Sequence, residues 1–236
     1  MTGVAETVYP GNRPRTIGSG KIFRFPLDKE AKCNQQENGT MDVSSCEKAI
    51  AKHLEDVFGQ RPKIFIHRET KDDPFFIGIT RVADYPASGM VTMSTIGTSS
   101  YPLFQDDGAE YPDTRVEFIA SAQAGQDADM EQALFRAAVF VGKIKGFARP
   151  GIFLHNLIGQ FRNSTHVPHA FLTTPFAYDG LEDMKVFSGQ RVSWLQVLPV
   201  SEEEISYAQE NSTDVLEDLF EREDIEWENI DRLSAV

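Results

Sequence analysis

Among the side chains whose types can carry acid–base or metal chemistry, we single out four: Glu117, His155, His166 and His169. Glu117 lies in an apolar stretch, where burial can raise the pKa of a carboxyl group and make it a general base. The three histidines could instead supply nitrogen ligands to zinc. Together these residues define one hypothesis, a hydrolase-like enzyme that uses Glu117 with the histidines as acid–base or metal-binding groups.

The spacing of these residues argues against a metal centre. Pro168 stands between His166 and His169 and prevents a helix from presenting both imidazoles on one face. No cysteine or carboxylate lies at the spacing of a zinc motif. Loop histidines can simply bond the backbone, and Glu117 can pair with an arginine or face solvent. We therefore expect no catalytic residue, metal ion or other cofactor, and keep the enzyme as the alternative.

Apolar periodicity predicts the elements that must position these side chains. Strands are expected over 63–67, 75–82, 90–96, 115–122, 152–158, 170–174 and 191–200, with a short edge strand within 21–27. Helices are expected over 45–58, from the capping pair Asp129 and Gln132 to about 145, over 202–209 after a capping box, and from Ser212 or Thr213 onward. The strands from 63 to 96 would form an antiparallel meander. Gly97, followed by small hydroxyl residues, would make either a tight structural corner or a cradle for a ligand.

Length and composition limit the class of protein. A chain of 236 residues with 41% hydrophobic residues is long and apolar enough to form a core. It has no apolar run of about 18 residues, so no membrane span is expected. The first residues carry neither a basic region nor an apolar region of a secretion signal, so we expect a cytoplasmic protein. Cys33 and Cys46 are then expected to be reduced thiols, although a disulfide is possible.

Most of the negative charge lies near the C-terminus. The formal net charge is −13, and residues 202–231 contain nine Glu and four Asp against Arg222 alone. Nucleic-acid binding is disfavoured because it requires a basic surface. An acidic surface suits a basic protein partner and speeds the encounter with it, although it can also serve only solubility. The residues predicted to bind such a partner are Glu202, Glu203, Glu204, Asp214, Glu217, Asp218 and Glu221.

Several landmarks occur in an order that resembles the Suppressor of Fused-like domain, particularly its stand-alone bacterial members. These landmarks are the strand that ends in a Thr95-x-Gly97-x-Ser99 turn, the strand around Glu117, the amphipathic helix after it, the junction from Trp194 through Pro199 to Glu204, and Ile230-Asp231-Arg232. Thr98 departs from the family pattern, in which a larger apolar residue is common at this position. The resemblance covers roughly residues 44–232 and rests on the order of these motifs.

This resemblance implies a single α+β domain with a mixed, mainly antiparallel twisted sheet and packed helices. It also implies a non-catalytic protein-binding role. Animal members restrain a transcription factor, and bacterial members look like immunity proteins that neutralise toxins. We expect residues 1–43 to form an extension with a possible edge strand, and residues 44–236 to form the domain with its acidic C-terminal helical segment. The expected partner is a protein, in particular a basic toxin domain.

Overall fold

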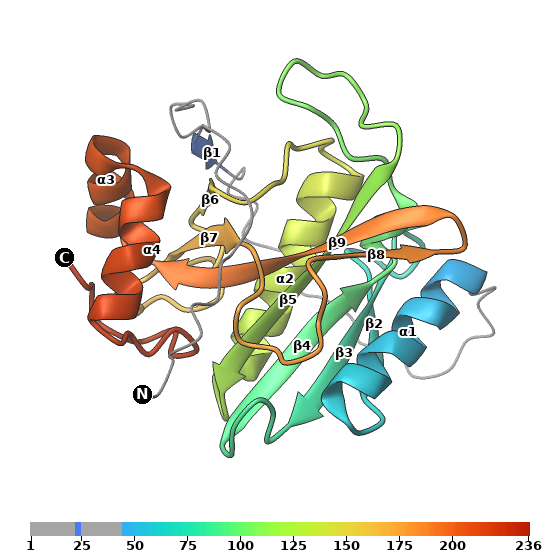
Figure 1. The fold of residues 1–236 in the computed structure, drawn as a ribbon, viewed down its shortest axis with the longest axis horizontal. Helices are drawn as coiled ribbons and strands as arrows, with labels where there is room; N and C mark the ends of the chain where they lie inside the picture. The colour runs from blue at the N-terminus through green and yellow to red at the C-terminus, as the bar shows by residue number, and fades with distance from the viewer. Residues whose placement is uncertain (1–21, 25–43) are drawn as a thin grey trace, which may run out of the picture.

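A computed structural model describes residues 22–24 and 44–236, which are built around one large β-sheet (Figure 1). Its strands are β1 (Ile22–Arg24), β2 (Lys63–His67), β3 (Ile77–Ala83), β4 (Met90–Ile96), β5 (Thr114–Gln123), β6 (Ile152–His155), β7 (His169–Thr173), β8 (Met184–Phe187) and β9 (Gln190–Val200). Their order is β1-β6-β7-β9-β5-β4-β3-β2, and β8 pairs with the first part of β9. The β5–β9 and β1–β6 pairs are parallel and the others antiparallel. This confirms the expected α+β fold with a mixed, mainly antiparallel sheet.

Two strands differ from the sequence-based expectation. The strand expected over 152–158 ends at His155, because Asn156 adopts a positive φ of 53° that turns the chain out of the sheet. Strand β8 was not expected at all. It joins β9 through Ser188 and Gly189, whose φ values of 50° and 86° match the two-residue hairpin turn that suits the twist of paired strands.

Four α-helices and a short 3₁₀ turn at Thr98–Ser100 complete the described part of the chain. The helices are α1 (Ser45–Phe58), α2 (Asp127–Gly142), α3 (Glu202–Asn211) and α4 (Thr213–Arg222). Helix α1 has the expected bounds and is capped by Ser44, whose hydroxyl accepts the Glu47 N–H. The expected capping pair of Asp129 and Gln132 is wrong, because α2 already begins at Asp127.

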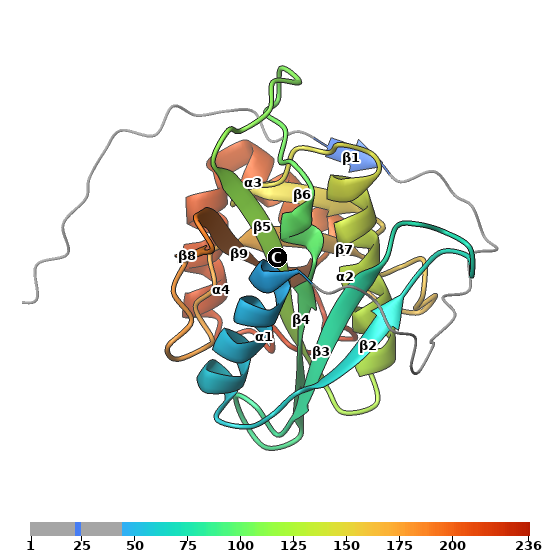
Figure 2. The ribbon, with the colours of Figure 1, turned by 90° about the vertical axis from the view of Figure 1, so that its right-hand side faces the viewer.

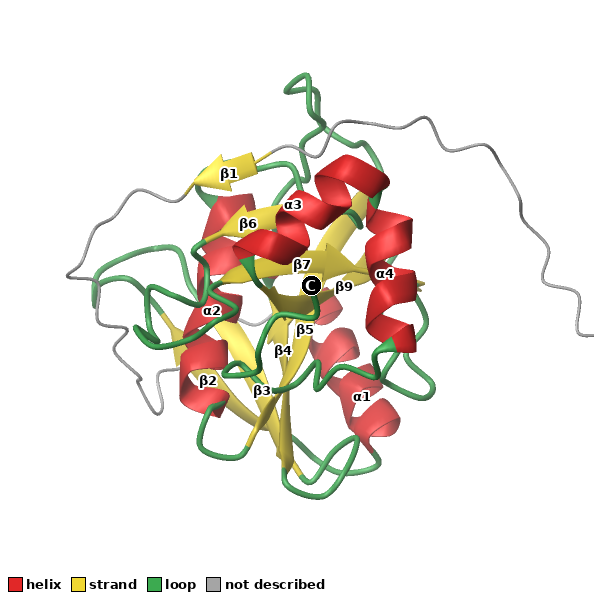
Figure 3. Cartoon of the chain, turned by 90° about the vertical axis from the view of Figure 1, so that its left-hand side faces the viewer, coloured by secondary structure: helices red, strands yellow, loops and turns green. Residues whose placement is uncertain are grey.

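The helices cover the two faces of the sheet unequally. Helix α2 packs on one face, and α1 lies on the other side of the sheet (Figure 2). Helices α3 and α4 cover the β6–β7–β9 end (Figure 3). The alternation along β9 follows this division, since Leu195 and Val197 join the core under α2. Trp194 packs beneath α1, and Leu198 packs beneath α3 and α4. Strand β9 therefore connects two separately covered regions of one sheet face.

Two further expectations from the sequence bear on the described residues. No helix among residues 22–24 and 44–236 combines the length and apolar character needed to cross a membrane. Cys46 is a free, half-buried thiol, whereas Cys33 lies outside the described residues.

Candidate protein-binding groove

A groove of about 1030 Å³ lies where the α3–α4 pair meets the β6–β7–β9 end of the sheet. Part of its lining is apolar and aromatic, contributed by strands, the loop after β7, helix α4 and the segment that follows α4. These residues are Phe153, Phe176, Leu198, Phe220, Ile225 and Trp227. Its volume is at the upper end of what small-molecule pockets occupy, roughly 300–1,000 Å³. The groove therefore has room for several side chains of a partner.

Helix α4 is fixed at the groove by its apolar face. Leu216, Leu219 and Phe220 are buried and belong to the same core cluster as Leu198. The side chain of Ser212, which stands alone between α3 and α4, accepts a hydrogen bond from the Val215 N–H and caps the helix. With these inward positions filled, the remaining positions of α4 face the groove rim and the solvent.

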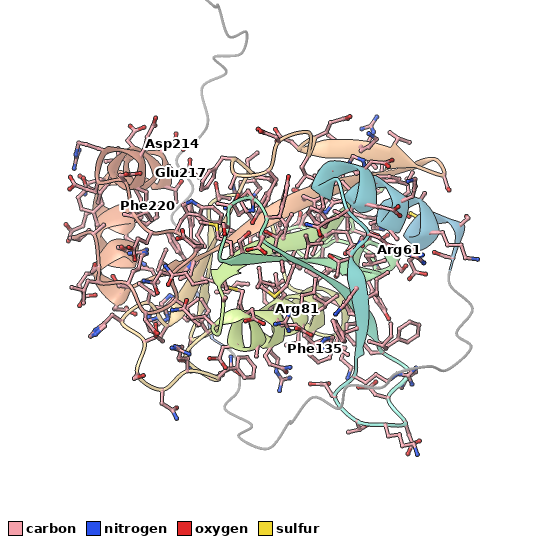
Figure 4. All side chains as sticks on the ribbon, turned by 90° about the horizontal axis from the view of Figure 1, so that it is seen from below. Arg61, Arg81, Phe135, Asp214, Glu217 and Phe220 are labelled. Carbon is pink, nitrogen blue, oxygen red and sulfur yellow. The ribbon has the colours of Figure 1, made fainter. Side chains whose placement is uncertain are left out.

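Carboxylates gather along this groove. Among the described residues, the lining includes Glu210, Asp214, Glu217, Asp218, Glu221 and Asp224, against one cation, Arg149. Figure 4 shows Asp214 and Glu217 beside Phe220 at one end of the molecule, with Arg61 towards the opposite end. Glu217 accepts a hydrogen bond from the Thr173 hydroxyl. With six acidic groups and one cation, the groove has a negative potential that favours a positively charged partner.

The seven acidic residues singled out from the sequence divide into three groups. Asp214, Glu217, Asp218 and Glu221 are exposed in the groove. Glu202 and Glu203 are exposed at the start of α3 and line a second, smaller hollow of about 400 Å³. Glu204 is fully buried and so is absent from the exposed surface.

The burial of Glu204 has a specific cause. Its carboxylate forms an ion pair with Arg232, with Nη1–Oε1 and Nη2–Oε2 distances of 2.6 and 2.9 Å. It also accepts the Ser201 N–H at 2.8 Å, while the Ser201 hydroxyl accepts the Glu204 N–H at 3.0 Å. This is the capping box that the sequence predicts, but its acidic member is engaged inside the protein. A carboxylate held in this way cannot contact a partner.

Glu117 is also buried and serves the turn after β4. Its carboxylate accepts hydrogen bonds from the Thr95 hydroxyl, the Gly97 N–H and both the N–H and the hydroxyl of Ser99. Gly97 has a φ of 108°, so the corner at this point requires a glycine. Burial raises the pKa of the Glu117 carboxyl group, and these hydrogen bonds oppose that rise. The corner alternative for this turn is therefore the one that the geometry supports.

The histidines do not converge with Glu117. Glu117 pairs with Trp194 on β9, whereas His169 pairs with Val200 six residues further along, so the two lie about 20 Å apart. His166 is exposed in the loop before β7. The enzyme hypothesis required these side chains to share one pocket, and that expectation is wrong.

Two histidines nevertheless meet Glu202 at the start of α3. The His155 and His169 rings have centroids 4.8 Å apart, and His169 Nε2 lies 2.9 Å from a Glu202 oxygen. The Asn156 N–H donates to His169 Nδ1 at 2.8 Å. Because Nδ1 accepts this bond, the neutral His169 ring carries its proton on Nε2 and donates it to Glu202. This hydrogen bond occupies Nε2, the atom that a metal ion would need as its ligand. In this arrangement the three groups link α3 to the sheet.

Sequence reasoning missed the aromatic part of the groove and the partner of Glu204. Phe176 and Trp227 come from segments 51 residues apart, and nothing local indicates that their rings meet. Arg232 stands 28 residues after Glu204. The available signal was Arg232, a basic residue that directly follows the strongly acidic segment. A buried carboxylate requires a cation or several donors.

Comparisons with known proteins agree on one family and one fold. The family model described as Suppressor of fused protein (SUFU) matches residues 73–233. The immunity protein YqcF of Bacillus subtilis (strain 168) is 28% identical over 197 residues, covering 83% of this chain and 100% of the relative.

Solved structures of the family share the fold at low identity. A SUFU homologue from Neisseria gonorrhoeae FA 1090 superposes with a TM-score of 0.57 at 15% identity, over 81% of this chain and 97% of that one. Drosophila Suppressor of Fused gives a TM-score of 0.56 at 14% identity, over 81% of this chain and 51% of that one. A chain of the Sufu–Fu complex gives 0.58 at 12% identity, over 81% and 92%.

Proposed function

Because the chain belongs to the Suppressor of fused protein (SUFU) family, we propose that it is a non-catalytic immunity protein that neutralises a toxin by binding it directly. The bacterial relative named as an immunity protein supports this role. A structural relative solved in a Sufu–Fu complex supports a protein as the partner. Neutralisation would take place in the cytoplasm, by covering a surface that the toxin needs.

The observation that carries this proposal is the exposed, acidic groove beside α4. Asp218 and Glu221 are exposed, and neither side chain has a hydrogen bond or ion pair with another described residue. Carboxylates without an internal partner remain available to a basic surface. Their potential would steer association and would weaken as salt screens it. The expected partner is therefore a basic toxin domain.

Titration of the chain against the toxin domain encoded beside its gene tests this proposal. We expect toxin activity to fall in proportion to the added chain and to vanish near one equivalent, because binding is stoichiometric. Raising the salt concentration should weaken the complex measured by calorimetry. Full inactivation by a small fraction of an equivalent would contradict the proposal, since only a catalyst turns over.

A charge-matched pair of variants separates the acidic groove from net charge. D218K/E221K reverses two groove carboxylates, and D72K/D113K reverses two exposed carboxylates elsewhere, so both change the net charge equally. Asp72 lies between β2 and β3, at the edge of the sheet farthest from α4. We expect the first variant to bind the toxin at least tenfold more weakly and the second to bind within about twofold of wild type. Equal effects of the two variants would show that binding depends on net charge and not on the groove.

A further inference from the structure

The groove combines its negative charge with an exposed aromatic side chain. Phe176 is 61% exposed, although it is one of the large apolar residues of the chain. Its ring meets that of Trp227 edge to face, at a centroid distance of 5.8 Å and an interplanar angle of 75°. Trp227 in turn contacts Tyr178 at 6.3 Å and 84°. An aromatic pair open to solvent beside a concave surface is a typical anchor point for a partner side chain.

The position of this aromatic pair is fixed before any partner arrives. The Phe176 N–H donates to the Gln196 side-chain oxygen at 3.1 Å, and Gln196 is fully buried in β9. Tyr178, which packs against Trp227, is itself buried and shares a hydrogen bond with Ser121 at 3.1 Å. A preformed anchor loses less conformational entropy on binding than a mobile one.

The groove brings the aromatic pair together with Asp218 and Glu221 of α4 in one lining. A bound side chain that packs on Phe176 and Trp227 therefore has carboxylates nearby for a charged neighbour. Arginine suits both features, because its guanidinium pairs with carboxylates and stacks on aromatic rings. Thr174, Gln209 and Asn211 also line the groove and offer polar groups to the backbone of a bound segment.

Building on the proposed function, we propose that the groove holds an extended segment of the partner in which an apolar or aromatic residue lies next to arginine. The apolar residue packs on Phe176 and Trp227, and the arginine pairs with Asp218 and Glu221. The six carboxylates of the lining disfavour an anionic ligand and a second copy of the same acidic face. Charge complementarity therefore selects a basic segment as the occupant.

Fluorescence anisotropy with three labelled heptapeptides tests the chemistry of the groove. Gly-Ser-Arg-Trp-Arg-Ser-Gly carries both features. One matched peptide has Glu in place of each Arg, and the other has Gly in place of Trp. We expect the first peptide to bind at least tenfold more tightly than either of the others. Equal binding of all three, or binding of none, would overturn the proposal.

Variants of the chain test whether the first peptide binds in this groove. We expect F176S and D218K/E221K each to weaken binding of the first peptide at least tenfold, and D72K/D113K to leave it within about twofold. Phe176 is largely exposed, so F176S should keep the wild-type melting curve. Unchanged binding by F176S would overturn the proposal. Binding that becomes measurable only in R13E/R15E would also overturn it, because the chain's own N-terminal segment would then be the occupant.

The toxin titration separates failure of this inference from failure of the proposed function. If F176S and D218K/E221K neutralise the toxin as well as wild type does, the immunity role stands and the groove assignment fails. If the peptide binds as expected but the wild-type chain does not inhibit the toxin, the groove assignment stands and the immunity role fails. Protection of residues 173–176 and 213–227 from hydrogen exchange in the toxin complex would support both.

Discussion

The buried carboxylate of Glu117 and the exposed carboxylates of helix α4 differ in what surrounds them. Glu117 is buried and accepts hydrogen bonds from three residues of the β4 strand and its turn. On α4, Asp218 and Glu221 are exposed and bond to no other described residue. Acidic residues of one chain can therefore serve either the fold or the exposed surface. Donors arranged around a carboxylate indicate a structural role, and exposure beside a groove indicates availability to a partner.

Removing Glu117 tests most directly whether the buried carboxylate has a structural role. We expect E117A to lower the free energy of unfolding by about 4 kcal/mol, because it leaves a cavity and strips buried donors of their acceptor. E117Q keeps the volume and one acceptor oxygen, so we expect a loss of about 2 kcal/mol. Urea denaturation measures both values. If E117A unfolds at the wild-type midpoint, the buried cluster does not stabilise the corner.

A second prediction concerns the buried ion pair of Glu204 and Arg232. R232A leaves Glu204 buried without its cation, and we expect a loss of about 3 kcal/mol. Because the pair acts as a unit, E204A/R232A should be less destabilised than the sum of the two single variants. A double-mutant cycle by urea denaturation measures this coupling. Strict additivity would indicate that the other donors to Glu204, from Ser201 and Ala235, hold it without Arg232.

The smallest expected effect is a pH dependence that originates at His169. Burial, followed by the nearby His155, lowers the pKa of His169 below its usual value of 6.5, while Glu202 and Glu203 oppose this shift. The unfolded chain therefore binds a proton at a higher pH than the folded chain does. Stability that is present above pH 6.5 should be lost as the pH falls towards the folded pKa.

The H169Q variant isolates this contribution. Its unfolding free energy should fall less steeply than that of wild type between pH 7 and pH 5. Burial also lowers the pKa of His53, so a smaller slope should remain in H169Q and decrease further in H53Q/H169Q. A wild-type slope in H169Q would show that the folded and unfolded states bind protons equally at this residue.

Local sequence signals were sufficient for most elements of the fold. The capping box of Ser201 and Glu204 predicts the start of α3, and the β-branched run after Met90 predicts β4. The start of α2 could not be read in this way, because the Asp127 carboxylate is engaged by the Gly125 N–H and by Arg81 of β3. The local apolar periodicity does not reveal contacts that a residue makes with a distant strand.

The sequence predicts the acidic part of the candidate site but not its aromatic part or the burial of Glu204, for the same reason. Charge density identifies the acidic C-terminal segment, but it cannot distinguish exposed Glu203 from buried Glu204, which are adjacent. That distinction depends on Arg232, which folding brings to Glu204 from 28 residues away. The aromatic pair of Phe176 and Trp227 depends in the same way on two segments that meet only in the folded chain.

The division of labour within α4 has an evolutionary consequence. Leu216, Leu219 and Phe220 attach this helix to the sheet, and Glu217 adds a hydrogen bond from Thr173 of β7. Asp218 and Glu221 bond to no other described residue. If the proposed groove holds the partner, exchanges at Asp218 and Glu221 would alter recognition and leave the scaffold intact. Under the proposed function, a lineage that meets successive toxins could then change its specificity on a single helix, and related chains would share one architecture with different specificities.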